Sequence, residues 1–238
     1  MHIFYTSSYD ASIYLQQPEQ NAGRDEILEV GKLYYGSTMD VARTLIKFNV
    51  SNLETGSGWK AYLNLKSANS EEIPLEYTIY ANAISQSWNM GTGTKFDNIT
   101  SNGVSWYYKN GIDKWMDYVV TPNSYASGSD TGSISNGGGG TWYTASMASQ
   151  SYSYEDADIR MNVTGIVNLW LSGSISNNGF ILHHSLTAEN IIITGADGNI
   201  VYTTGLNTIF ISPTWNSSTS RFPYIIGLSV ISKYLGAK

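Results

Sequence analysis

The sequence predicts an all-β protein, a jelly-roll-like antiparallel β-sandwich with one short helix at about residues 164–172 capping an end. Many short runs alternate apolar and polar residues, as strands with one buried face do, and Gly, Asn and Ser separate the runs. The length of 238 residues suits one large β domain, and 42% hydrophobic residues are enough to build its core. We therefore expect a single domain over residues 1–238.

The alternating pattern predicts the strands in chain order. The clearest is ARTLIKFNV (42–50), in which Ile46, Phe48 and Val50 face one way and Leu45 faces the other. The complete set of predicted strands is 3–6, 11–15, 26–34, 42–50, 60–67, 75–84, 104–108, 142–144, 157–163, 179–184, 190–194, 199–203, 208–212 and 223–232.

The helix is the exception to this pattern. Ile166, Val167 and Trp170 recur at helical spacing and form one apolar stripe. Thr164 is the expected N-cap, and Gly173 is the expected residue just past the C-terminus. We expect the stripe to cover the apolar end of the sandwich, which makes Trp170 a core residue and not a ligand-binding one.

The low-complexity segment NSYASGSDTGSISNGGGGT (123–141) predicts a flexible Gly/Ser-rich loop. Loops of this length are usually functional or disordered, and consecutive glycines lose much backbone entropy when they become ordered. We expect a mobile surface loop. The alternative is a segment that becomes ordered on a partner.

The composition excludes several classes of function. The formal net charge is −6 and the 13 basic residues are scattered, so no basic stripe predicts nucleic-acid binding. There is no cysteine, which excludes disulfides, thiol catalysis and Cys-ligated zinc. No run approaches the ~18 apolar residues that span a membrane, so we expect no membrane insertion. The N-terminal stretch lacks the features of a signal peptide.

The sequence contains no recognisable catalytic motif, and we expect a non-enzymatic protein without a cofactor. His183 and His184 are adjacent on a predicted strand, so their rings face opposite sides and cannot share a metal. Glu155, Asp156 and Asp158 are weak candidates for a structural calcium site, because calcium prefers oxygen ligands. The alternative for these three acids is a solvated turn.

Aromatic residues are concentrated in the middle of the chain. Exposed Trp and Tyr rings give rigid contact area suited to sugar rings or to protein partners. The alternative is that some members of each group belong to the core. The candidates for an interface or ligand surface are Trp106, Tyr107, Tyr108, Trp115, Trp142 and Tyr143.

Several phrases, in order, resemble the DNRLRE-type β-sandwich family. They are ARTLIKFNVS (42–51), AYLNLKSA (61–68), SWNMGTGTKFDN with GVSWYYKNG and the following Trp (87–115), IRMNVTGIVNLWLSGSISNNGFIL (159–182) and TIFISPTWNSSTSRFPYIIGLSV (208–230). The chain departs from the family pattern at Asn162, where Asp is usual, and in its long glycine loop. The resemblance implies a jelly-roll-like sandwich used for attachment or carbohydrate contact in large surface proteins.

A subset of stand-alone chains similar to this one looks like virion structural proteins of tailed marine bacteriophages. The resemblance therefore implies a component of the phage tail, baseplate or neck, made in the host cytoplasm and located in the virion. Its expected partners are other virion proteins, including homo-oligomeric or ring-symmetric copies of itself. The alternative is a carbohydrate-binding or adhesin module that contacts host surface glycans.

Overall fold

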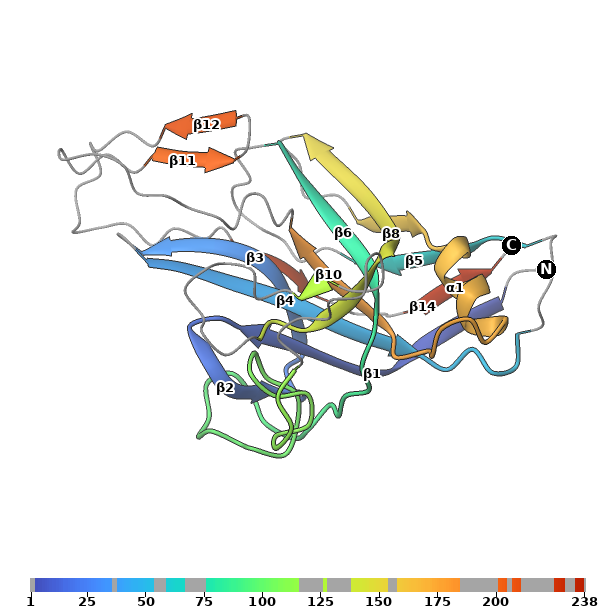
Figure 1. Cartoon of the computed structure of the whole chain (residues 1–238), viewed down its shortest axis with the longest axis horizontal. Coiled ribbons are helices and arrows are strands. Elements are labelled where there is room, and N and C mark those ends of the chain that lie inside the picture. Colours follow the sequence, from blue (N-terminus) through green and yellow to red (C-terminus); the bar gives the residue numbers. More distant parts are fainter. Residues whose placement is uncertain are drawn as a thin grey trace.

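The computed structural model confirms the all-β sandwich with one short helix (Figure 1). It describes residues 3–35, 38–53, 59–66, 76–115, 126–127, 138–153, 158–184, 201–204, 207–210, 225–229 and 234–237. Every strand pairing among these residues is antiparallel. Within the described part of the chain, no helix is both long and apolar enough to cross a membrane.

The elements follow one another along the chain with a single helix among the described residues. They are β1 (Ile3–Tyr14), β2 (Gln17–Ala22), β3 (Ile27–Tyr35), β4 (Thr38–Phe48), β5 (Ala61–Leu65), β6 (Glu76–Ile84), β7 (Ala126–Ser127), β8 (Thr141–Ser153), β9 (Ile159–Asn162), α1 (Thr164–Leu171), β10 (Phe180–His184), β11 (Val201–Thr204), β12 (Asn207–Phe210), β13 (Ile225–Ser229) and β14 (Tyr234–Ala237).

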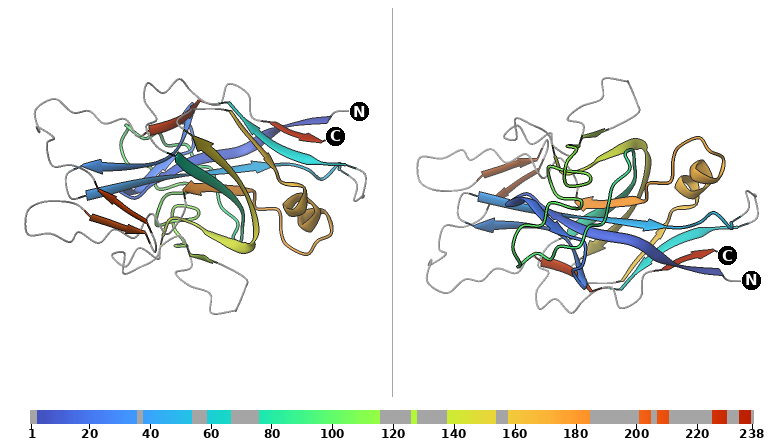
Figure 2. Two further views of the ribbon diagram at one scale, coloured as in Figure 1. Left: turned by 90° about the horizontal axis from the view of Figure 1, so that it is seen from above. Right: turned by 90° about the horizontal axis from the view of Figure 1, so that it is seen from below.

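Strand β1 belongs to both layers of the sandwich. Its first residues pair with β14, and its remainder pairs with β4 after a register shift between Ser7 and Tyr9. Such irregularities let a strand pass from one sheet to another. The smaller layer contains the start of β1 with β14, β5 and β9, whereas the larger contains β1, β4, β10, β6 and β8 (Figure 2). The two ends of the described chain therefore meet in one sheet.

The main core lies between these two layers. Alternate residues of β4 and β10 face it, including Ile46, Phe48 and Phe180, and meet Leu63 and Met161 from the smaller layer. All five side chains are buried. This arrangement is the expected outcome of period-2 patterning, because one face of each strand supplies the core.

Helix α1 covers one end of this core, as predicted. Ile166, Val167 and Trp170 are buried, and the Trp170 ring lies 4.7 Å from that of Phe180 between centroids. Gly173 has a φ of 72° and donates its N–H to the Trp170 carbonyl at 3.1 Å, as an αL glycine past a helix end does. The predicted N-cap is displaced by one residue: Val163 is the N-cap, and the Thr164 hydroxyl accepts a hydrogen bond from the Ala61 N–H at 2.9 Å.

Most predicted strands are confirmed within a few residues, with some differences. The predicted strands 3–6 and 11–15 form one continuous strand, and 142–144 is the start of the much longer β8. Strands β2, β7 and β14 were not predicted. The predicted strand 104–108 is wrong, because these residues form no ladder with another described strand and contribute only an isolated bridge between Tyr108 and Lys114. The predicted strand 190–194 lies outside the described residues.

Only parts of the predicted mobile loop at 123–141 are described, and these parts belong to ordered structure. Residues 126–127 form β7, and Gly138–Gly140 are buried; residues 123–125 and 128–137 lie outside the described part. Gly139 has a φ of 75°, and its carbonyl accepts a hydrogen bond from Arg43 Nη1 at 2.6 Å. A side chain at Gly139 would collide with the Arg43 guanidinium and the Trp106 ring. Glycine is needed here because the backbone itself packs in the interior.

Candidate contact surface on the 85–115 segment

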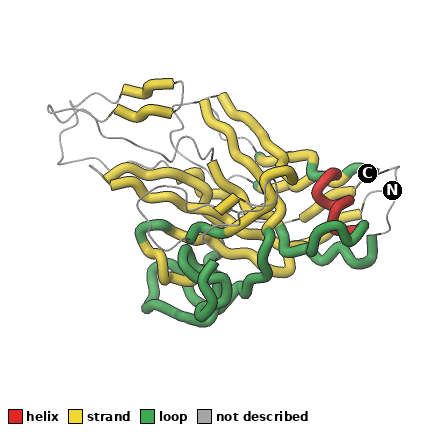
Figure 3. The backbone as a smooth tube through the Cα atoms, viewed as in Figure 1, coloured by secondary structure: helices red, strands yellow, loops and turns green. Residues whose placement is uncertain are grey.

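Residues 85–115 form a layer of irregular structure, named here the loop layer, against the second face of the larger sheet. Figure 3 shows this segment as a continuous loop region beside β2. The sheet side chains beneath it alternate with those of the main core: Leu45 and Ile181 face the loop layer, whereas Ile46 and Phe180 face the other way. The described residues therefore form two cores, one on each face of the larger sheet.

Four buried tryptophans anchor the loop layer to this second core: Trp88, Trp106, Trp115 and Trp142. The Trp88 indole N–H donates to the Asn178 carbonyl at 2.8 Å, and the Trp115 indole N–H donates to the Ser105 carbonyl at 3.0 Å. A buried indole combines a large apolar area with one donor that needs a partner. These bonds therefore fix the ring orientations of Trp88 and Trp115.

Arg43 of β4 is buried beneath two of these rings. Its guanidinium carbon lies 4.6 Å from the centroid of the Trp106 ring and 5.3 Å from that of the Trp142 ring. A planar guanidinium stacks well on aromatic faces, and the attraction is stronger when the pair is desolvated. Arg43 therefore ties the central strand β4 to the loop layer and to the start of β8.

Asn21 of β2 is the main polar link to the loop layer. Its fully buried amide donates to the carbonyls of Met90, at 2.7 Å, and Val104, at 2.8 Å, and its oxygen accepts the Gly93 N–H at 2.7 Å. The neighbouring Gln20 amide donates to the Thr94 carbonyl at 2.5 Å. One short strand thus satisfies backbone groups at several points of a segment that has almost no strand ladder of its own.

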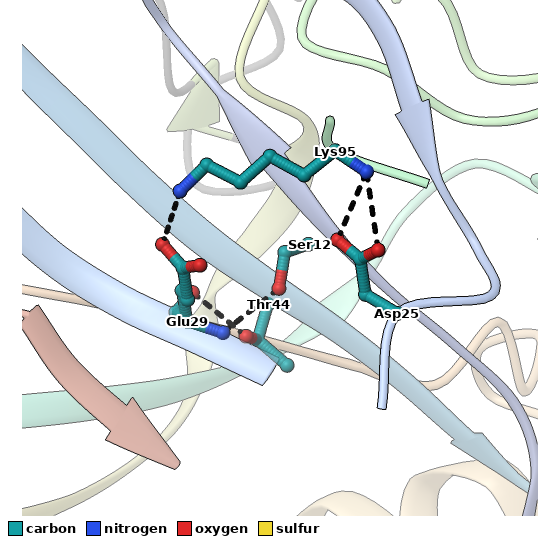
Figure 4. Close-up of polar contacts among 5 residues, drawn as sticks. All are labelled: Ser12, Asp25, Glu29, Thr44 and Lys95. Atoms are coloured by element: carbon teal, nitrogen blue, oxygen red, sulfur yellow. Dashed lines mark hydrogen bonds and ion pairs between the residues drawn. The ribbon is translucent and has the colours of Figure 1, made fainter. Parts of the chain in front are cut away.

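Lys95 joins the loop layer to β1, β3 and the turn between β2 and β3 (Figure 4). Its ammonium lies 2.7 Å from a Glu29 carboxylate oxygen and 4.1 Å from the centroid of the Tyr14 ring. Its backbone N–H donates to the Asp25 carboxylate, at 3.1 Å to the nearer oxygen. The hydroxyl of Ser12 accepts the Glu29 N–H at 2.8 Å, which positions this part of β3.

Burial changes the acidity of two groups in this cluster. Desolvation raises the pKa of the Tyr14 hydroxyl above its usual range, and the nearby Glu29 charge raises it further. Desolvation also raises the pKa of the Asp25 carboxyl, and this outweighs the opposing influence of the Lys95 N–H and ammonium. Tyr14 therefore stays neutral, and the Asp25 carboxylate is held in a partly dehydrated site.

The outer side of the loop layer exposes three large apolar side chains: Phe96 is 88% exposed, Ile112 81% and Ile99 65%. Gly111 packs directly against the Ser101 carbonyl, so the backbone that carries Ile112 returns to the stretch that follows Ile99. Phe96 is three residues from Ile99 along the same segment. Exposed apolar side chains that form a contiguous patch typically mark a contact site. These three side chains, exposed on one loop layer, are therefore the candidates for such a site.

The structure corrects half of the predicted aromatic surface. Trp106, Trp115 and Trp142 are buried and serve as anchors of the second core, so they offer no exposed ring. Tyr107 and Tyr108 are half-exposed on the loop layer, and their ring planes are 84° apart. Tyr143 is also half-exposed but packs against the main core.

The remaining predicted site residues fall elsewhere. Glu155 and Asp156 lie outside the described residues, and Asp158 forms an exposed ion pair with Lys66 at 3.0 Å. Among the described residues, no group of three or more His, Asp or Glu side chains is placed to hold a metal ion. His183 is buried, with its ring stacked 4.7 Å from Trp142.

No sequence pattern predicted the role of Asn21, which makes more hydrogen bonds to the loop layer than its neighbour Gln20 does. Asn21 lies in QNAG, which resembles an ordinary polar turn, and its partners are about seventy or more residues away. The exposed Phe96, Ile99 and Ile112 were likewise not predicted, because apolar residues in loops carry no periodic pattern. The glycines of SWNMGTGTKFDN are the one available signal: Gly91 and Gly93 pack against Asn21 without room for a side chain.

No protein-family model matches the chain, and no curated protein sequence matches it either. The resemblance to the DNRLRE-type family therefore stays a prediction based on the quoted phrases.

Proposed function

We propose that this chain is a non-enzymatic structural protein of a bacteriophage particle, in the tail, baseplate or neck, that acts through protein–protein contacts. The observation that carries the contact role is the exposure of Phe96, Ile99 and Ile112 on a loop layer held by buried tryptophans. The assignment to a phage particle comes from the sequence resemblance.

A rigid support for an exposed apolar surface favours binding. A preorganised contact surface loses little conformational entropy on association, so more of the interaction energy is retained. The Asn21 and Lys95 links and the indole anchors provide that support. Burying one large apolar side chain contributes about 1.5–3 kcal/mol, so the three together are sufficient to dominate a small interface.

The geometry favours a protein partner over a glycan. A sugar-binding platform usually presents aromatic faces that lie in one plane, and the Tyr107 and Tyr108 rings are almost perpendicular. The large indoles that would extend such a platform are buried. Phe96, Ile99 and Ile112 have no polar groups in their side chains with which to bind sugar hydroxyls.

The test is the presence of the chain in purified particles and its dependence on the three side chains. Mass spectrometry of particles from the phage that encodes the chain is expected to find it at a fixed ratio to the major structural proteins. The F96S/I99S/I112S variant is expected to be depleted from the particles, whereas the control variant I27S/M147S, which removes two exposed apolar residues outside the loop layer, is expected to be retained.

Absence of the chain from purified particles would overturn the structural role. Equal depletion of the loop-layer variant and the control variant would show that the loop layer is not the contact surface. Specific binding of the isolated protein to host polysaccharide, lost in the loop-layer variant, would favour the adhesin function instead.

A further inference from the structure

A second surface with different chemistry lies on the outward face of β5 and β9. Side chains of these strands alternate between the main core and the outside: Ala61, Leu63 and Leu65 of β5 are buried. The register pairs Tyr62 with Asn162. The outward residues, named here the β5/β9 face, are Lys60, Tyr62, Asn64, Lys66, Asp158, Arg160 and Asn162.

The β5/β9 face is cationic in a protein whose net charge is −6. Its charged residues are three cations and one carboxylate, and Lys66 and Asp158 neutralise each other at 3.0 Å. Among the described residues the charges of Lys60 and Arg160 therefore remain, and both side chains are exposed. Within the described part of the chain, neither Lys60 nor Arg160 has a carboxylate within ion-pair distance.

The Arg160 guanidinium is held in place at this face. Its carbon lies 5.0 Å from the centroid of the half-exposed Tyr62 ring. A guanidinium over a ring face keeps its donors around its own edge, where they suit a carboxylate. Arg and Tyr are also the residue types most enriched among the energetically dominant residues of protein interfaces.

The polar side chains around this pair suit a protein surface better than a sugar. The Asn64 amide donates to the Tyr62 carbonyl at 3.1 Å, and the Asn162 amide oxygen accepts from the Thr164 N–H at 3.1 Å and from its hydroxyl at 2.6 Å. Each amide already uses one of its two ends within the chain, which leaves fewer groups to bind hydroxyl groups. One tyrosine ring on a sheet face offers only a single stacking position.

We propose that the β5/β9 face docks on an acidic surface of another protein, with Arg160 and Lys60 facing carboxylates and Tyr62 between them. This surface is independent of the loop layer. Strands β5 and β9 lie toward the end of the molecule that carries both termini, away from the loop layer (Figures 1 and 2). Two different surfaces at separate places would let the protein link two different neighbours, as a connecting component of an assembly must.

The experiment measures binding of fluorescein-labelled poly-L-glutamate to the full chain by fluorescence anisotropy at low salt. Heparin and double-stranded DNA serve as competing polyanions of other classes. Binding is expected to weaken with added salt and to fall about tenfold in K60Q/R160Q, since two favourable charge interactions are lost. The matched variant R24Q/K114Q removes one exposed Arg and one exposed Lys near or on the loop layer and is expected to bind like the unmodified chain.

Amide NMR shifts of the unmodified chain give a second measurement that needs no variant. Addition of poly-L-glutamate is expected to shift the resonances of β5 and β9 and to leave those of residues 85–115 unchanged. Equal losses in the two double variants, shifts elsewhere, tighter binding of heparin or DNA, or no binding at all would each overturn the proposal. None of these results bears on whether the loop layer is a contact surface.

Discussion

The Asn21 side chain accepts the Gly93 N–H at 2.7 Å, and this bond joins the short strand β2 to the loop layer. The same amide donates to the Met90 and Val104 carbonyls. A single side chain therefore holds both ends of the segment that presents Phe96 and Ile99. Because the site is buried, each of these backbone groups depends on Asn21 for its hydrogen bond.

Replacing Asn21 with alanine is expected to destabilise the protein strongly. The N21A variant leaves buried backbone groups without partners, which should lower the free energy of unfolding by about 2–4 kcal/mol. Urea unfolding measures the change, and N98A, at an exposed position of the same loop layer, is the control. A loss in N21A no larger than that in N98A would contradict the role of Asn21 as the main polar link.

Replacing Arg43 even with lysine is expected to destabilise the protein. The R43K variant keeps the charge but loses the planar group that lies against Trp106 and Trp142, at a cost of about 1–3 kcal/mol. Thermal unfolding gives the loss of stability, and tryptophan emission reports the altered surroundings of the two indoles. The exposed substitution R160K controls for the chemical change, and an equal loss in both variants would argue against the buried stacking.

The sequence predicts the main sandwich because the alternation of buried and outward-facing residues along each strand is a local, periodic pattern. Strand β4 shows this clearly: Leu45 and Ile46 alternate between two buried faces, as their position in a central strand requires. The sequence predicts the helix for the same reason, because the helical spacing of Ile166, Val167 and Trp170 indicates which side of the helix is buried. Such periodic patterns can be interpreted without knowing which distant residues are in contact.

The loop layer could not be predicted in the same way. The sequence predicts a strand at Trp106 and makes its ring a candidate for an exposed contact surface. In the structure the ring is buried against Arg43, a residue more than sixty positions earlier in the chain. Which aromatic residue is an anchor and which is exposed depends on such long-range packing. Gly139 illustrates the point: its φ and its lack of a side chain matter only because Arg43 and Trp106 occupy the adjacent space.

The Asp25 carboxylate gives a prediction about pH. Burial raises its pKa in the folded protein above the ordinary value of about 3.9. The folded state then binds the proton more tightly than the unfolded state does, so this group favours folding at low pH and its contribution is lost as the pH rises through the raised pKa. At neutral pH the ionised carboxylate therefore reduces stability.

The D25N variant is expected to be more stable than the unmodified chain at neutral pH. An asparagine oxygen still accepts the Lys95 N–H and carries no charge that needs hydration. The difference in the free energy of unfolding should shrink as the pH is lowered toward 4, because Asp25 becomes protonated as well. Urea unfolding across this range measures it, with D113N as an exposed control. A difference that grows on acidification would have the wrong sign for a carboxyl with a raised pKa.

Gln150 links two strands that do not pair with each other. From β8, its amide nitrogen donates to the Asp158 carbonyl at 3.0 Å, and its oxygen accepts the Arg160 N–H at 2.7 Å. The side-chain amide thereby takes the place of a peptide group of a neighbouring strand at the edge of β9, beside the β5/β9 face. The same groups of an edge strand would otherwise be open to another chain.

Two substitutions of Gln150 distinguish the hydrogen bond that its amide nitrogen donates from the one that its oxygen accepts. The Q150A variant should expose the Arg160 amide to solvent, speed its hydrogen exchange and cost about 1 kcal/mol of stability, the usual net contribution of such a bond. The Q150E variant keeps the acceptor oxygen and loses only the donor, so exchange at Arg160 should remain slow in it. Amide exchange measured by NMR at a pH where the new carboxyl is ionised distinguishes the two. If Arg160 exchanges equally slowly in Q150A, the edge of β9 is protected by something other than Gln150.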